Sequence, residues 1–218
     1  MVQVKICGIT NLEDALAAVA AGAHALGFNF YRKSPRFIEP AAVREIVRQL
    51  PANLLMVGVF VNEAEPDTVA RLADEAEVGA VQLHGDESPE YCGALPGRFV
   101  IKALRVGEGY WPEQAMRYPV DAILLDAFDA SNSGARGGTG QICDWTLARR
   151  TCELVPKLFL AGGLAPENVA EAIAVVRPYG VDAASGLEIL PGRKDAARMR
   201  AFVLAARKTA ADYADSTD

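Results

Sequence analysis

Two side chains that can transfer protons stand at the ends of strand-like runs, far apart along the chain. Cys7 follows the run "VQVKI" (2–6), and Asp126 follows "VDAILL" (120–125). A cysteine in a strand is more often a small hydrophobic residue than a reactive thiol, and a carboxylate at a strand end often caps the next turn. If both side chains face one cavity, they form the acid–base pair that an isomerase needs.

Glycine-rich loops follow three strand-like runs in the second half of the sequence. Their residues are Gly138, Thr139 and Gly140, then Gly162 and Gly163, then Ser185 and Gly186. Any one of these glycines is as consistent with a simple turn as with a phosphate site. Three such loops together predict a phosphate site, because backbone N–H groups without side chains can approach an anion closely. The loop over 126–140 has the length of a binding loop.

Other polar residues stand at predicted strand ends. Arg36 follows Pro35 in "KSPR", and a guanidinium there can hold a carboxylate through two parallel hydrogen bonds, although such basic clusters are usually solvated. Gln82 and His84 occur in "QLHGDE", where we expect them to contact substrate. His24, by contrast, begins a strand, and we expect a structural role for it.

Eight runs rich in apolar and β-branched residues are predicted strands: 2–6, 25–30, 54–61, 80–83, 99–104, 120–125, 157–161 and 180–184. They are apolar nearly throughout, as parallel strands with both faces covered are. Helical patterns separate them. We expect Asn11 to cap the first helix, Pro40, Pro66 and Pro166 to open three others, Gly22 and Gly79 to end two, and a last helix over about 194–211.

Eight strand–helix units in 218 residues favour a single α/β domain, a (β/α)8 TIM barrel, over a doubly wound open sheet. We expect the barrel to span 1–211 and the acidic residues 212–218 to form a flexible tail. In such a barrel the carboxyl ends of all strands meet at one rim. The barrel would therefore bring the reactive side chains and the glycine loops together.

Charge and cysteine usage restrict the partners. The net charge of −6 argues against nucleic acid and anionic membranes, and no apolar run reaches the roughly 18 residues of a membrane span. The sequence starts with a strand-like run, so we expect no signal peptide. The four cysteines are Cys7, Cys92, Cys143 and Cys152. Their wide spacing predicts no metal site and a reducing, cytoplasmic location.

The motifs occur in an order that resembles one family. "KICGIT", "GFNFYRKSPR", "VGVFVN", "QLHGDE", "LLDA", "GGTG", "LAGGLAPENV" and "SGLE" followed by "KD" are similar to the phosphoribosylanthranilate isomerase family over about residues 4–195. The resemblance implies a (β/α)8 barrel that performs an Amadori rearrangement of a phosphosugar in tryptophan biosynthesis. It implies no metal or organic cofactor, and a monomer or a homodimer.

The resemblance also implies roles for individual residues. Cys7 corresponds to the general base, Asp126 to the general acid, and Arg36 to the group that binds the anthranilate carboxylate. Phosphate-binding loops contain Gly140, Gly163, Ser185 and Gly186. The base must be partly ionised, and we hypothesise that Lys5, two residues away on the same strand face, assists this ionisation.

Two other functions stay open at the level of sequence. A related aminoaldose–ketose isomerase of histidine biosynthesis performs the same rearrangement, but usually has aspartate at the position of Cys7 and a second phosphate site. A catalytically inactive barrel that binds phosphosugars is the other alternative. The presence of both Cys7 and Asp126 argues against it.

Overall fold

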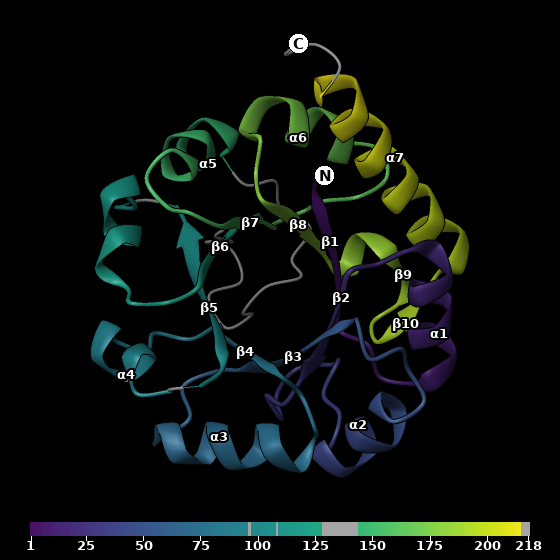
Figure 1. The fold of residues 1–218 in the computed structure, drawn as a ribbon, viewed down its shortest axis with the longest axis vertical. Coiled ribbons are helices and arrows are strands. Elements are labelled where there is room, and N and C mark those ends of the chain that lie inside the picture. The colour runs from purple at the N-terminus through teal and green to yellow at the C-terminus, as the bar shows by residue number, and fades with distance from the viewer. Residues whose placement is uncertain (96, 108, 128–143, 215–218) are drawn as a thin grey trace.

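The computed structural model describes residues 1–95, 97–107, 109–127 and 144–214. Eight parallel strands close into a barrel, and the helices surround it (Figure 1). The predicted TIM barrel is therefore confirmed. Three residues of the predicted phosphate site, Gly138, Thr139 and Gly140, lie outside the described residues, as does Cys143.

Each of the eight predicted strands is present, with ends that lie within two residues of the prediction. The strands are β1 (Gln3–Cys7), β2 (Ala25–Asn29), β3 (Leu55–Phe60), β4 (Ala80–Leu83), β5 (Phe99–Val106), β6 (Ala122–Ala127), β7 (Leu158–Leu160) and β8 (Gly180–Ala183). Each strand pairs with the next in sequence, and β8 pairs with β1, which closes the barrel.

Alternation along the strands divides the buried residues into two groups. One phenylalanine and otherwise small or aliphatic side chains fill the barrel: Ala25, Val57, Ala80, Ile101, Ala103, Ala122, Leu124, Phe159 and Ala161. The residues between them along the strands, such as Ile6 and Leu26, pack outward against the helices. Cys7, Gln82 and Asp126 share the inward alternation, so the barrel directs all three toward its interior at the carboxyl ends of the strands.

The helices follow the strands in order: α1 (Leu12–Ala21), α2 (Pro40–Val47), α3 (Pro66–Glu75), α4 (Pro89–Gly93), the 3₁₀ helix η1 (Pro112–Arg117), α5 (Trp145–Cys152), α6 (Val169–Val176) and α7 (Ala196–Ala214). Asn11 caps α1 by accepting a hydrogen bond from the Asp14 amide, and Gly22 ends it with φ of 93°. Proline opens α2 and α3, as predicted.

Three predicted helix boundaries are wrong. Pro166 does not open α6, because the Asn168 side chain bonds the Ala165 amide and the Gly163 carbonyl and folds 166–168 into a turn. Gly79 does not end α3; Glu77 adopts the left-handed conformation first, with φ of 56°. Helix α7 ends at Ala214 rather than near residue 211, and 215–218 lie outside the described residues.

Beyond β8 the chain forms a short 3₁₀ helix and a hairpin before α7. These elements are η3 (Ser185–Leu187), β9 (Glu188–Leu190) and β10 (Arg193–Lys194). Within the hairpin, Lys194 pairs with Glu188, and Arg193 with Leu190. This hairpin extends the loop after β8, which is one of the predicted phosphate loops. No helix among the described residues has the length and apolar character required to cross a membrane.

Candidate active site at the carboxyl rim of the barrel

Cys7 ends β1 beside a buried ion pair. Lys5, two residues earlier on the same face, is completely buried, and its Nζ donates to Oδ1 of Asp182 on β8 at 2.9 Å. Gly27 of β2 lies directly against both side chains. A Cβ atom at Gly27 would lie 2.7 Å from Cys7 Sγ and 3.1 Å from Lys5 Nζ, so only glycine leaves room for the two functional groups.

Burial and charge act on the Cys7 thiol in opposite directions. Burial raises the pKa of Cys7, and the neighbouring Lys5 ammonium opposes this rise without cancelling it. Burial is the largest single effect on Lys5 and works against its charge, but Asp182 and Cys7 together outweigh burial, so the pKa of Lys5 is raised. Lys5 therefore acts in the hypothesised direction, yet the pKa of Cys7 lies above its ordinary value, so the thiolate is a minor species.

Asp126 lies on the inward face of β6 and contacts a histidine from β4. His84 Nε2 lies 3.1 Å from Asp126 Oδ2, and His84 Nδ1 lies 2.8 Å from Gln82 Nε2. Gln82 is completely buried. The three side chains form one hydrogen-bonded chain, and Gln82 would act on a bound molecule through the His84 ring.

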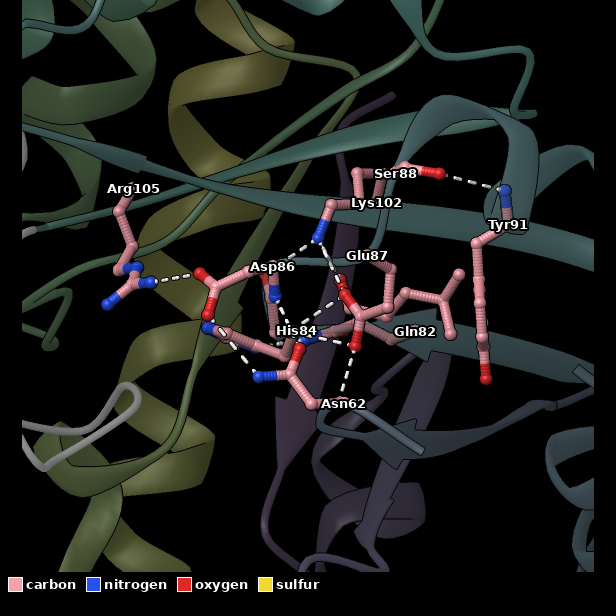
Figure 2. A network of polar contacts seen from close by, with 11 residues as sticks. Asn62, Gln82, His84, Asp86, Glu87, Ser88, Tyr91, Lys102 and Arg105 are labelled. Atoms are coloured by element: carbon pink, nitrogen blue, oxygen red, sulfur yellow. Dashed lines mark hydrogen bonds and ion pairs between the residues drawn. The ribbon is translucent and has the colours of Figure 1, made fainter. Parts of the chain in front are cut away.

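A second buried ion pair fixes the turn that contains His84. Glu87 accepts hydrogen bonds from the Asn62 amide at 2.8 Å, the Gly85 amide at 2.9 Å and Lys102 Nζ at 2.8 Å. Lys102 also donates to the Gly85 carbonyl at 2.8 Å. Figure 2 shows this cluster around the His84 turn. Because each partner is buried or bonded to backbone, the turn after β4 is held rigidly.

Glycine is required at the centre of this turn. A Cβ atom at Gly85 would lie 2.1 Å from Asn62 Oδ1 and 2.6 Å from Glu87 Oε1. At the outer edge, Asp86 accepts from Arg105 at 2.5 Å (Figure 2). The sequence motif "QLHGDE" indicated the strand end, but not that its acidic residues position the histidine.

Arg36 forms a bidentate ion pair with a residue that sequence reasoning missed. Its Nε and Nη2 donate to Glu188 Oε1 and Oε2 at 2.9 and 2.8 Å. The stem of Arg36 packs over Gly8, where a Cβ atom would lie 2.5 Å from Arg36 Cδ. Gly8 follows Cys7 directly, so the structure brings the predicted carboxylate-binding residue next to the predicted base.

The predicted phosphate loops after β7 and β8 are in contact. A Cβ atom at Gly186 would lie 2.2 Å from the Leu164 carbonyl oxygen, and Gly162 and Gly163 have φ of 82° and 66°. The residues of both loops that we predicted from sequence, Ser185 included, are partly exposed. Among the described residues, no group of three or more His, Cys, Asp or Glu side chains could hold a metal ion.

The fold and this rim define a (β/α)8-barrel protein with a thiol at the carboxyl end of one strand and a histidine-bound carboxyl group at the carboxyl end of another. The chain belongs to the N-(5′-phosphoribosyl)anthranilate isomerase family, which matches residues 4–205. An N-(5′-phosphoribosyl)anthranilate isomerase of Citrifermentans bemidjiense is 50% identical over 210 residues, which cover 96% of this chain and 99% of that protein.

Solved structures agree with this assignment. The dimeric phosphoribosylanthranilate isomerase of Thermotoga maritima, studied in a monomeric form, is 44% identical with a TM-score of 0.84, covering 95% of this chain and 100% of that one. A phosphoribosylanthranilate isomerase bound to reduced 1-(o-carboxyphenylamino)-1-deoxyribulose 5-phosphate has the same identity, TM-score and coverage.

Proposed function

We propose that Cys7 and Asp126 are the base and the acid of the family's reaction in this chain. That reaction converts the aminoaldose N-(5-phosphoribosyl)anthranilate to the aminoketose 1-(2-carboxyphenylamino)-1-deoxyribulose 5-phosphate, a step of tryptophan biosynthesis. One observation carries the assignment of residues. Both side chains lie on the inward alternation at the carboxyl ends of β1 and β6, which are separated by β7 and β8 around the ring.

The two groups act in sequence. Asp126, as the carboxylic acid, donates its proton to the ribose ring oxygen; the bond between that oxygen and C1′ breaks, and a protonated Schiff base forms. The Cys7 thiolate then removes the C2′ proton to give an enolamine, which becomes the ketone when C1′ gains a proton and the hydroxyl group on C2′ loses one. Each of the two positioned proton transfers accounts for about 10²- to 10⁴-fold in rate.

His84 and Gln82 allow Asp126 to hold or release its proton. With Asp126 ionised, His84 donates from Nε2 and accepts at Nδ1 from the Gln82 amide. With Asp126 protonated, its hydroxyl donates to Nε2, while Nδ1–H donates to Gln82 Oε1 after the amide rotates. Gln82 Oε1 has no hydrogen-bond partner among the described residues, so the rotation breaks no other bond of that oxygen.

The two ends of the substrate account for binding. Arg36 lies next to Cys7 and is the candidate for the anthranilate carboxylate. The partial exposure of Gly162, Gly163, Ser185 and Gly186 supports phosphate binding by the loops after β7 and β8. For the loop with Gly138, Thr139 and Gly140, the support is the sequence alone.

The presence of Cys7 disfavours the histidine-biosynthesis isomerase. The second candidate is an inactive barrel that binds phosphosugars. A measurement of turnover distinguishes it from the enzyme. Anthranilate fluorescence should fall when the wild-type protein is added to the aminoaldose. Cys7→Ala should abolish this change while still binding the reduced product analogue.

Cys152→Ala is the matched control, because Cys152 is a half-buried thiol in α5, outside the barrel. It should keep the wild-type rate. A wild-type protein that binds the analogue without consuming the aminoaldose would contradict the proposal. Growth of a tryptophan auxotroph that lacks this step, with and without Cys7, tests the same assignment in cells.

The remaining partner proposals are a phosphosugar as the small-molecule ligand, no nucleic acid, and a cytoplasmic location. The family supports the phosphosugar, the net charge of −6 argues against nucleic acid, and the wide spacing of the four cysteines favours a reducing compartment. The Thermotoga relative is dimeric and has also been studied as a monomer, so the proposed state of this chain is a monomer or a homodimer. Light scattering coupled to size-exclusion chromatography distinguishes the two states.

A further inference from the structure

Glu188 is the centre of a buried ionic cluster at the rim. Its side chain is only 4% exposed and accepts three hydrogen bonds, two from Arg36 and one from Lys194 Nζ at 2.8 Å. Burial works against the charge on Glu188, but these hydrogen bonds and charges leave its pKa below the ordinary value. Glu188 is therefore a carboxylate at neutral pH, and it neutralises only part of the positive charge around it.

The cluster connects the two ends of the proposed substrate site. Arg36 packs over Gly8 beside Cys7, whereas Lys194 donates to the carbonyl of Ala184, the residue that precedes Ser185 of the phosphate loop. Glu188 lies between them and follows η3 directly in sequence. One carboxylate thus orients the residue expected to recognise the substrate carboxylate and is tied to the loop expected to recognise the phosphate.

The ion pair with Glu188 leaves one nitrogen of the Arg36 guanidinium, with both of its N–H groups, for a ligand. Glu188 occupies Nε and Nη2 in a fork, and Arg36 Nη1 has no hydrogen-bond partner in the described part of the chain. The Arg36 side chain is 12% exposed, so it reaches the surface at the rim. A long arginine side chain loses rotamer freedom when it binds a ligand, and a side chain that is already fixed does not lose it again.

We propose that Glu188 is a positioning residue for carboxylate recognition: it fixes Arg36 beside Cys7 with Nη1 left for the carboxylate of the substrate. The inference rests on the proposed function, since it assumes that Arg36 meets an anthranilate carboxylate. It predicts a sign. If Glu188 positions Arg36, its removal weakens binding of the carboxylate; if Glu188 competes with the carboxylate for Arg36, its removal strengthens binding.

The test compares two ligands that differ by one group. These are reduced 1-(o-carboxyphenylamino)-1-deoxyribulose 5-phosphate and its analogue that lacks the carboxylate, each titrated against wild type and Glu188→Gln. We expect about a tenfold weaker affinity of Glu188→Gln for the carboxylate ligand, and less than about a twofold change for the other. General loss of structure would affect both ligands equally, so the ratio isolates the role of Glu188.

Two further variants complete the cycle. In an Arg36→Met background, Glu188→Gln should leave the ratio of the two affinities unchanged, because the residue that Glu188 positions is absent. Glu39→Gln is the matched control: it removes the carboxylate partner of Arg32, an exposed pair in the loop after β2, and should behave as wild type.

The outcomes separate the two proposals. Equal weakening of both ligands, or tighter binding of the carboxylate ligand by Glu188→Gln, would overturn the positioning role while wild-type turnover upheld the enzyme. Failure of the wild-type protein both to bind the carboxylate ligand and to turn over the aminoaldose would overturn the proposed function, and the role of Glu188 with it.

Discussion

His84 Nε2 lies 3.1 Å from Asp126 Oδ2, and this contact links the carboxyl ends of β4 and β6. The ring is also fixed from its other side by Gln82, and its turn is fixed by the buried Glu87–Lys102 pair. The proposed acid therefore depends on a histidine whose orientation is set by the barrel interior on one side and by the turn after β4 on the other.

Replacing His84 with alanine should impair Asp126 without removing it. The carboxyl group loses the partner that orients it, so we expect kcat to fall by about 10- to 100-fold, as small misplacements of catalytic groups do. Asp126→Asn should cost more, up to about 10⁴-fold, because it removes the proton donor itself. Steady-state kinetics of both variants show which of them loses more kcat. A larger loss in His84→Ala than in Asp126→Asn would instead make His84 the acid.

Replacing Lys5 with methionine should move the pH–rate profile to higher pH. The ammonium lowers the pKa of the Cys7 thiol, so its loss raises that pKa further, and the rising limb of kcat/KM, which follows thiol ionisation, shifts upward. The single change also leaves Asp182 buried without its cation, which costs about 3–5 kcal/mol.

The double variant Lys5→Met/Asp182→Asn controls for this loss of stability. Lys5 acts on the Cys7 thiol more strongly than Asp182 does, so the limb should still shift upward, by a smaller amount. If neither variant moves the profile, Lys5 has no part in ionising Cys7.

Arg36→Met should raise KM far more than it lowers kcat. The guanidinium lies at the rim and is proposed to bind the end of the substrate remote from the bonds that change, which is uniform binding. Steady-state kinetics at saturating and limiting aminoaldose separate the two constants. Equal losses in kcat and kcat/KM would mean that Arg36 acts mainly in the transition state.

The fold followed from the sequence because local patterns and barrel geometry agree. Each strand is a short apolar run, and such runs need both faces covered, which parallel strands in a barrel provide. Once the barrel was expected, its geometry placed Cys7 and Asp126 at one rim although 119 positions separate them. The shared face of Lys5 and Cys7 followed from the two-residue period of a strand.

Contacts between distant residues did not follow. Arg36 and Glu188 are 152 positions apart, and no local pattern marks one as the partner of the other. Lys102 occurs within an apolar run, where the sequence indicated a strand but not a buried ion pair with Glu87. The pKa of Cys7 depends on how far burial outweighs Lys5, a balance that only three-dimensional packing sets.

His24 should make the protein less stable in mild acid. Its Nδ1 accepts the Val4 amide at 3.0 Å, and burial, with Arg207, lowers the pKa of His24 below 6.5. Because the unfolded chain then binds the proton more readily, this contribution is fully present above pH 6.5 and is lost as the pH falls through the folded-state pKa.

His24→Asn tests this, since its side-chain oxygen can accept the same amide but does not titrate in this range. Urea unfolding of both proteins from pH 8 to 5 measures the free energy of unfolding at each pH. The two proteins should have a similar pH dependence at high pH, and below 6.5 the free energy of unfolding should fall faster for the wild type. Parallel curves over the whole range would refute the role of His24.

Gly27→Ala should damage catalysis through packing alone. The added methyl group would lie 2.7 Å from Cys7 Sγ and 3.1 Å from Lys5 Nζ, so the thiol must move by several tenths of an ångström. A displacement of about 1 Å costs roughly 100-fold in rate, so we expect kcat to fall about tenfold or more.

Gly79→Ala is the matched control, because a methyl group there meets nothing within 4 Å, and its φ is not positive. Its kinetics should equal those of wild type. If Gly27→Ala also kept the wild-type kcat, the position of the Cys7 thiol beside Lys5 would not be required for turnover, and the assignment of Cys7 as the base would lose its geometric support.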